Sequence, residues 1–236
     1  FIIGPVLGGF LLDLLDWRSI FYVRAPVCLL TLLLGIFLLK PDHRSSRSLR
    51  LDLRGALTSS FGIFCLVYGL SRTSGSGLLS PATLVWTGSG VFILGVFILL
   101  ERTARDPIVD LSLFQNRTLM FASISMFLTF ISAPPFFLIM PFYLIEGIRV
   151  TPSEAGLLLA ANSVAAIICG PISGTLSDRF GARPFAASGA AATVAAFLLM
   201  MFFDVHTGMP EIVAVLALLG IGIGMFQSPN SSMFMG

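Results

Sequence analysis

The sequence predicts an all-α integral membrane protein, a polytopic bundle of about eight helices. Three observations predict this class. Charge is scarce, because 14 Lys+Arg and 12 Asp+Glu make up only 11% of the 236 residues, while 56% are hydrophobic. A soluble domain usually carries about 25% charged residues. The charges gather in short clusters between long uncharged windows, and the clusters alternate between rich and poor in arginine.

Eight windows of the sequence contain no formally charged residue. Most are long enough for a membrane helix, which needs about 20 apolar residues. They are apolar on all sides and lack the apolar–polar alternation of a membrane β-barrel. The first is short and predicts a partial helix, and apolar residues before Arg24 extend the second. In chain order the windows are 1–12, 25–39, 55–71, 73–100, 118–145, 155–177, 184–203 and 212–236.

Lysine and arginine are unevenly distributed over the seven charge clusters. Residues 40–54, 101–117 and 178–183 hold ten of the 14 basic side chains. Cytoplasmic loops carry the excess of Lys and Arg, so these three loops are expected in the cytoplasm. The other connections then face outward. The expected location is the plasma (inner) membrane.

Several classes of protein are excluded by composition. A net charge of +2 with one lysine, Lys40, provides no surface for nucleic acid. The cysteines, Cys28, Cys65 and Cys169, lie in apolar runs without CxxC spacing, so we expect no metal and no cofactor. No window contains a cluster of His, Asp or Glu, so an enzyme is not expected. The longest loop, 40–54, is too short for a receptor domain.

The first window contains a pattern of small residues. Gly4 and Gly8 are four apart, so they share one helix face, and Gly9 follows. Pro5 removes a backbone donor and favours a bend. A face of small residues lets a second helix approach closely. Ordinary small-residue packing is enough to explain this pattern.

The charge cluster 178–183 has a more specific pattern. Gly174, Asp178, Arg179, Gly181 and Arg183 recur at a spacing that a simple excess of positive charge does not require. A membrane helix is expected to end shortly before, near residue 177, and Gly181 permits a tight turn. Asp178 is expected to face a helix N-terminus or to pair with an arginine.

A few polar side chains lie where the chain is expected to cross the membrane. Arg24 either extends to the outer interface or lines a cavity as a cation. Asn162, Gln227 and Asn230 either make hydrogen bonds between helices or line a substrate cavity. Gln227 and Asn230 are three apart and are expected on one face. The prolines in window 118–145 predict either fixed kinks or a flexible gate.

Several of these motifs resemble a known family. Gly-x-Leu-x-Asp-Arg-x-Gly-x-Arg, residues 174–183, resembles the cytoplasmic loop signature of the major facilitator superfamily. Gly-Pro-x-x-Gly-Gly, residues 4–9, resembles the antiporter motif of its fifth helix. The run 17–26 is similar to that of the fourteen-helix drug/proton antiporters, although Arg24 stands where they usually have Asn. Further similarity lies at Glu101 with Pro107, Leu111, Leu113 and Phe114, and in residues 220–230.

The resemblance implies an organisation for the whole chain. The chain would be an internal fragment, helices five to twelve, truncated at both ends, with the missing helices of its own full-length chain as partners. Residues 1–39 would end the N-terminal bundle, and 118–236 would start the C-terminal bundle. Residues 55–100 would be two inserted linker helices. Cytoplasmic loops 40–54 and 101–117 would flank them.

The resemblance also implies a function. It suggests a secondary active transporter that exports amphipathic drugs or other small organic compounds by alternating access, in exchange for protons. Its partners would be the lipid bilayer, the small organic substrate and protons. In this family the motif at residues 4–9 packs the helices that seal the cavity, and the motif at 174–183 latches helices in one conformation.

Three alternatives remain open. A metabolite uniporter or symporter would have the same fold, and a membrane receptor or an intramembrane enzyme would belong to another class. No window contains Asp or Glu. A proton-coupled carrier normally needs an ionisable group in its pathway. If coupling exists, its carboxylate is expected in the missing helices.

Overall fold

The computed structural model describes residues 3–38, 52–104, 107–109 and 111–235. Most of the predicted basic loop 40–54 lies outside the described residues, as do residues 105, 106 and 110 of the loop 101–117. Every regular element in the described part is helical, which confirms the predicted fold class. The chain divides into two compact units, residues 1–40 with 121–236, and residues 41–120.

Helices account for nearly all of both units. Seven described helical segments are long and apolar enough to cross a membrane, and α1 is a shorter apolar helix. These eight match the eight predicted windows. The larger unit contains α1 (Ile3–Leu14), α2 (Ser19–Leu38), most of α6 (Arg117–Phe142), the π-helix η2 (Tyr143–Gly147), α7 (Pro152–Phe180), α8 (Ala182–Met200) and α9 (Met209–Met235). The smaller unit contains α3 (Leu53–Ser71), α4 (Thr73–Ser76), α5 (Pro81–Glu101) and the 3-10 helix η1 (Leu111–Gln115).

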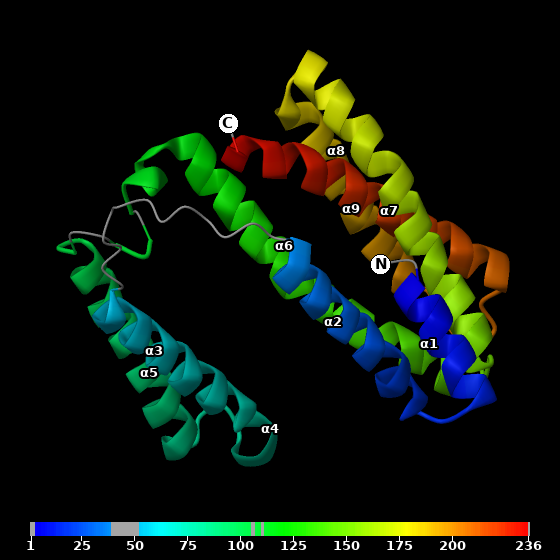
Figure 1. Ribbon diagram of the computed structural model, residues 1–236, viewed down its shortest axis with the longest axis horizontal. Coiled ribbons are helices and arrows are strands. Elements are labelled where there is room, and N and C mark those ends of the chain that lie inside the picture. Colours follow the sequence, from blue (N-terminus) through cyan, green and yellow to red (C-terminus); the bar gives the residue numbers. More distant parts are fainter. Residues whose placement is uncertain (1–2, 39–51, 105–106, 110, 236) are drawn as a thin grey trace. The chain divides into compact units, whose positions relative to one another are not determined.

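The smaller unit is built on the α3–α5 pair (Figure 1). Both helices begin with a side-chain cap: Asp52 accepts from the Gly55 N–H, and Ser80 accepts from the Thr83 N–H. Such caps satisfy backbone donors that a helix start leaves free. Glycines then bring the two helices together, because a Cβ at Gly90 would meet the backbone of Leu66 at 2.6 Å. Packing of this kind needs no polar contacts, as is usual between membrane helices.

In the larger unit α9 packs against both α7 and α8 (Figure 1). Gly220 and Gly224 face α7, where added Cβ atoms would meet the backbone carbonyls of Asn162 and Ala166. Gly222 faces α8 instead, where an added Cβ would lie 2.5 Å from the Thr193 Oγ1. Glycines two residues apart lie on different sides of a helix, so the run 220–224 serves two neighbours at once.

The hydrophobic core of this unit lies where α9 meets the end of α6 and the start of α7. Leu144, Ile212 and Leu216 have no exposed surface, and Phe136 and Met140 of α6 join the same cluster. Around this core, many large apolar side chains are exposed, and α2 buries only Ser19. Apolar exposure along whole helices suits a protein surrounded by lipid.

Gly181 alone separates α7 from α8. Its φ of +90° lies in the region that favours glycine, and its N–H donates to the Ser177 carbonyl at 2.8 Å. The tight turn predicted from the sequence is therefore present. The helix before it runs to Phe180, three residues beyond the expected end near Ser177.

Candidate functional site

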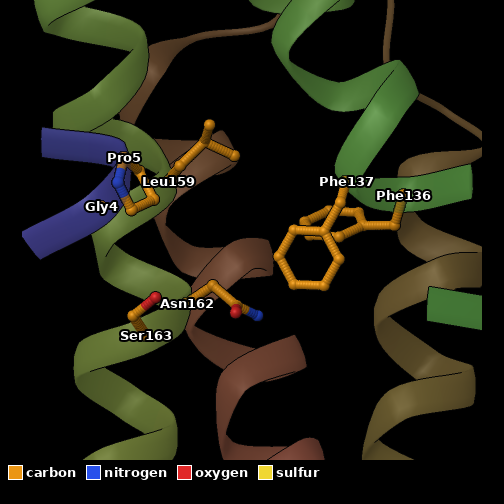
Figure 2. Close-up of a pocket in the computed structure, with 7 residues that line it drawn as sticks. All are labelled: Gly4, Pro5, Phe136, Phe137, Leu159, Asn162 and Ser163. Carbon is orange, nitrogen blue, oxygen red and sulfur yellow. The ribbon is translucent and has the colours of Figure 1, made fainter. Parts of the chain in front are cut away.

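A cavity of about 340 Å³ lies in the larger unit where α1, α6 and α7 meet. Figure 2 shows the rings of Phe136 and Phe137 on one side, and Gly4, Pro5 and Leu159 on the other. Its volume falls at the lower end of the range for small-molecule pockets, about 300–1,000 Å³. An apolar wall with two aromatic rings suits a flat hydrophobic compound.

Asn162 and Ser163 add the polar groups of the cavity lining. The Asn162 side chain is directed into the space between the two walls (Figure 2). It is 6% exposed, and its Nδ2 donates to the Leu216 carbonyl of α9 at 3.4 Å. The two alternatives predicted for Asn162 are therefore compatible. One amide proton can bond the neighbouring helix while the amide still faces the cavity.

The wall formed by Gly4 and Pro5 depends on close packing of α1 against α7. An added Cβ at Gly9 would overlap the Pro152 carbonyl, and one at Gly156 would overlap the Pro5 carbonyl. Gly4 and Gly8, expected to form the packing face, have no atom of the described residues within 4 Å of an added Cβ. Within the motif at residues 4–9, the contacts with the glycines of this interface and with α7 are made by Pro5, Val6 and Gly9. Gly4 lines the cavity instead.

A polar contact closes one end of the α1–α7 interface. The Ser153 N–H, at the start of α7, donates to the Asp13 Oδ2 at 2.8 Å. An acidic group at a helix N-terminus is stabilised by the helix dipole. Asp13 lies near the end of α1 and Ser153 near the start of α7, next to connections that the positive-inside rule predicts to be on the outer side.

A second polar contact joins η2 to the connection between α8 and α9. The Tyr143 hydroxyl donates to the Asp204 backbone carbonyl at 2.7 Å, and the Tyr143 ring stacks on Phe203. In the turn that follows, the backbone N–H of His206 donates to the Asp204 carboxylate, which lowers the pKa of Asp204 below its ordinary value. A hydrogen bond to the charged form has this effect.

The motif at residues 174–183 lies around the α7–α8 connection. Gly174 faces α9, where an added Cβ would approach the Ser228 Oγ to 2.7 Å. The charged members, Asp178, Arg179 and Arg183, are exposed. In the described part of the chain Asp178 makes no ion pair with either arginine. The Arg179 guanidinium lies 5.5 Å from the centre of the Phe180 ring.

The other candidate cavity residues lie apart from the cavity described above. Arg24 is exposed on α2. Gln227 is exposed and Asn230 is 2% exposed, so their environments differ although they are three residues apart. The Asn230 Nδ2 has no hydrogen-bond partner within the described residues.

Several notable residues were not predicted as site residues, although Glu101 was among the residues that resemble the family. Phe136 and Phe137 are two of 22 phenylalanines, and Gly156 is one of 23 glycines. Glu101, at the end of α5, is 3% exposed, and its Oε1 has no partner in the described part of the structure. It also lines a cavity of about 550 Å³ in the smaller unit. A buried carboxylate without a full set of partners is unusual.

A family model described as Major Facilitator Superfamily matches residues 1–236. The chain belongs to this superfamily. The resemblance of the motifs at 4–9 and 174–183 is thus confirmed at the level of the family. A superfamily member of this kind is a membrane transporter rather than an enzyme.

Curated relatives within the superfamily match nearly the whole chain. "Multidrug resistance protein Stp" of Mycobacterium tuberculosis is 31% identical over 98% of this chain and 43% of its own length. "Tetracenomycin C resistance and export protein" of Streptomyces glaucescens is 29% identical over 93% of this chain and 41% of its own length. "Uncharacterized MFS-type transporter YhcA" of Bacillus subtilis is 26% identical over 96% of this chain and 42% of its own length. The chain spans less than half the length of these relatives.

Proposed function

We propose that this chain is part of a secondary active transporter that exports amphipathic small organic compounds by alternating access. The observation that carries the proposal is the cavity between α1, α6 and α7. It combines two phenyl rings, an apolar wall and one amide, which suits a ligand with a flat apolar body and one polar group. One relative is named for multidrug resistance and another for tetracenomycin C resistance and export, which supports the same class of substrate.

Pro5 and Gly9 are proposed to keep α1 close to α7 and so to form one wall of the cavity. Gly4, which lines that wall, and Gly8 are proposed to be packing positions toward other helices of the whole protein. Gly174, Asp178, Arg179, Gly181 and Arg183 are proposed to act at the cytoplasmic side as a conformational latch. Exposed charges at Asp178 and Arg183 support this, because they are free to find partners in another conformation. Arg24, Gln227 and Asn230 remain proposals for the cavity of the whole protein.

We propose that protons drive the export and that helices outside this chain complete the proton pathway. The domain division is proposed as predicted, with residues 55–100 as two inserted helices. Their formation of a separate compact unit with the flanking residues supports it. The proposed location is the plasma (inner) membrane, with the loops 40–54, 101–117 and 178–183 in the cytoplasm.

The cavity is tested by substitutions in the full-length protein. Phe137→Ala is expected to slow ethidium efflux from cells at least fivefold, because it removes half of the aromatic wall. Asn162→Ala is expected to do the same by removing the amide. Phe142→Ala is the control, since Phe142 lies on the same helix, is 60% exposed and does not line the cavity.

Equal efflux in the Phe137→Ala variant and the parent, at matched expression, would exclude this cavity as the substrate site. Proton coupling is tested separately in proteoliposomes that contain the full-length protein. Dissipating the pH gradient with nigericin is expected to abolish ethidium accumulation. Equilibration of ethidium across the membrane at the same rate with and without a proton gradient would favour a uniporter.

A further inference from the structure

The start of α7 has an unusual arrangement of backbone donors. Pro152 occupies the first helical position and has no N–H to satisfy. The Thr151 Oγ1 accepts from the Glu154 N–H at 3.3 Å, and the Glu154 Oε2 accepts from the Thr151 N–H at 2.9 Å. This capping box satisfies the N–H groups of Thr151 and Glu154. The Ser153 N–H is the donor that it leaves over.

Asp13 of α1 fills that remaining position. Its Oδ2 accepts from the Ser153 N–H at 2.8 Å across a sequence separation of 140 residues. Hydrogen bonds that involve a charged acceptor are stronger than neutral ones. The carboxylate also lies at the positive end of the α7 dipole. A single side chain thus completes the cap of another helix.

This contact adds to an interface that is otherwise held by close packing. Below Asp13, Gly9 packs on the backbone of Pro152 and Ser153, and Gly156 packs on the backbone of Pro5 and Val6. Further along lies the cavity lined by Gly4, Asn162 and Ser163. The Asp13 contact is therefore at one end of an α1–α7 interface that leads to the cavity.

We propose that Asp13 is a positioning residue of the transport cycle: its bond to the start of α7 keeps the outer end of the α1–α7 interface closed. Breaking this bond shifts the protein toward the form that is open to the outside. The inference rests on the proposed function, because only a carrier that opens alternately to the two sides needs a releasable contact here. It extends that function by naming a residue outside the motif at 4–9.

The neighbouring carboxylate Asp16 provides a matched control. Asp16 lies in the connection just after α1, three residues beyond Asp13, and its Oδ1 accepts from the N–H groups of Arg18 and Ser19, each at 3.1 Å. These contacts are local to its own segment. Loss of Asp16 removes the same charge from the same end of α1 without removing a bond to α7.

The test measures how readily the cavity is reached from outside. Ser163→Cys is introduced as a reporter in the full-length protein after replacement of its natural cysteines. Intact cells are treated with a membrane-impermeant maleimide, and the labelling rate of the reporter is recorded. Addition of Asp13→Ala is expected to raise this rate about tenfold. Asp13→Glu is expected to restore the slow rate, because it keeps the charged acceptor, and Asp16→Ala is expected to leave the rate unchanged.

The outcomes are decisive in each direction. Equal labelling in the Asp13→Ala and parent proteins overturns the proposal, and so does an equal increase in Asp16→Ala. If Asp13→Ala does not give a single peak in size-exclusion chromatography, Asp13→Leu, which has a similar size and no acceptor, is compared with Asp13→Glu, and the Leu variant must label faster. The assay does not depend on ethidium efflux. If Asp13→Ala labels faster than the parent but the parent exports no ethidium, the proposed substrate class is contradicted. The proposed role of Asp13 in closing the interface then still holds.

Discussion

Glu101 is a carboxylate in an environment that gives it few hydrogen bonds. Its Oε2 accepts from the Val109 N–H at a long 3.3 Å, and its Oε1 has no partner within the described residues. An added Cβ at Gly55 would lie 2.8 Å from the Glu101 Oε1 and 2.5 Å from the Asp52 Oδ2. Two carboxylate oxygens therefore face the same glycine. Burial of one of these oxygens without a hydrogen-bond donor lowers the free energy of unfolding.

Glu101→Gln is expected to stabilise the protein. The amide keeps an oxygen for the Val109 N–H and provides an N–H₂ group for the Asp52 carboxylate, while it removes a buried charge. A thermal midpoint a few degrees above that of the full-length parent in detergent is expected. Glu146→Gln, at an exposed carboxylate of η2, should leave the midpoint unchanged. A lower midpoint for Glu101→Gln would mean that the charge itself has a partner or a function.

At the scale of the helix, the glycines of α9 are the clearest link between sequence and packing. The three glycines in 220–224 place two close contacts on α7 and one on α8. The sequence placed this run among the features similar to the antiporter group, but its periodicity does not say which neighbour each glycine meets. That information lies in pairs of residues far apart along the chain.

Gly224→Ala is expected to lower the free energy of unfolding by about 1–3 kcal/mol, as overpacking of a close interface does. The added Cβ would lie 2.6 Å from the Ala166 carbonyl oxygen, and backbone cannot move aside easily. Gly170→Ala is the matched control on α7, because no atom in the described part of the chain lies within 4 Å of its added Cβ. Thermal unfolding of both purified full-length variants would measure the difference. Equal midpoints would show that α7 and α9 can separate without loss of stability.

The helices themselves follow from the sequence, and many of their contacts do not. Uncharged windows of about 20 residues fix the spans, since a backbone in lipid must satisfy its own hydrogen bonds. Gly181 was predicted at its turn because its neighbours are charged and its position is between two apolar windows. The contact of Asp13 with Ser153 could not be predicted, because no local pattern links residues 140 apart. For the same reason Gly4 and Gly8 were expected at a packing face where Gly9 makes the contact instead.

At the scale of the whole molecule, the positive-inside rule makes a prediction about the two ends of α5. Ser74 lies in the connection before α5, which is expected outside, and Thr103 lies just after α5, in a loop expected inside. Both side chains are exposed. Single cysteines at these positions in the full-length protein should differ in intact cells. Ser74→Cys should react with an impermeant maleimide at once, and Thr103→Cys only after permeabilisation.

The reverse labelling pattern would invert the orientation of the whole chain, including the cytoplasmic assignment of the motif at 174–183. Labelling of both positions in intact cells would instead indicate that α5 does not cross the membrane. The experiment therefore separates an error in orientation from an error in the number of spans. The positive-inside rule acts on the full set of loops, so one pair of sites tests all of them.

The placement of α9 between its two neighbours has a consequence for biogenesis. A ribosome releases α7 and α8 before α9, and the single residue Gly181 joins them as a hairpin. During that interval the Asn162 amide lacks the Leu216 carbonyl, and Gly189 lacks the backbone of residues 222–226. Until α9 is inserted, the α7–α8 hairpin therefore exposes a polar side chain and small-residue surfaces to the bilayer. Insertion of α9 covers these surfaces and completes the packing of α7, α8 and α9.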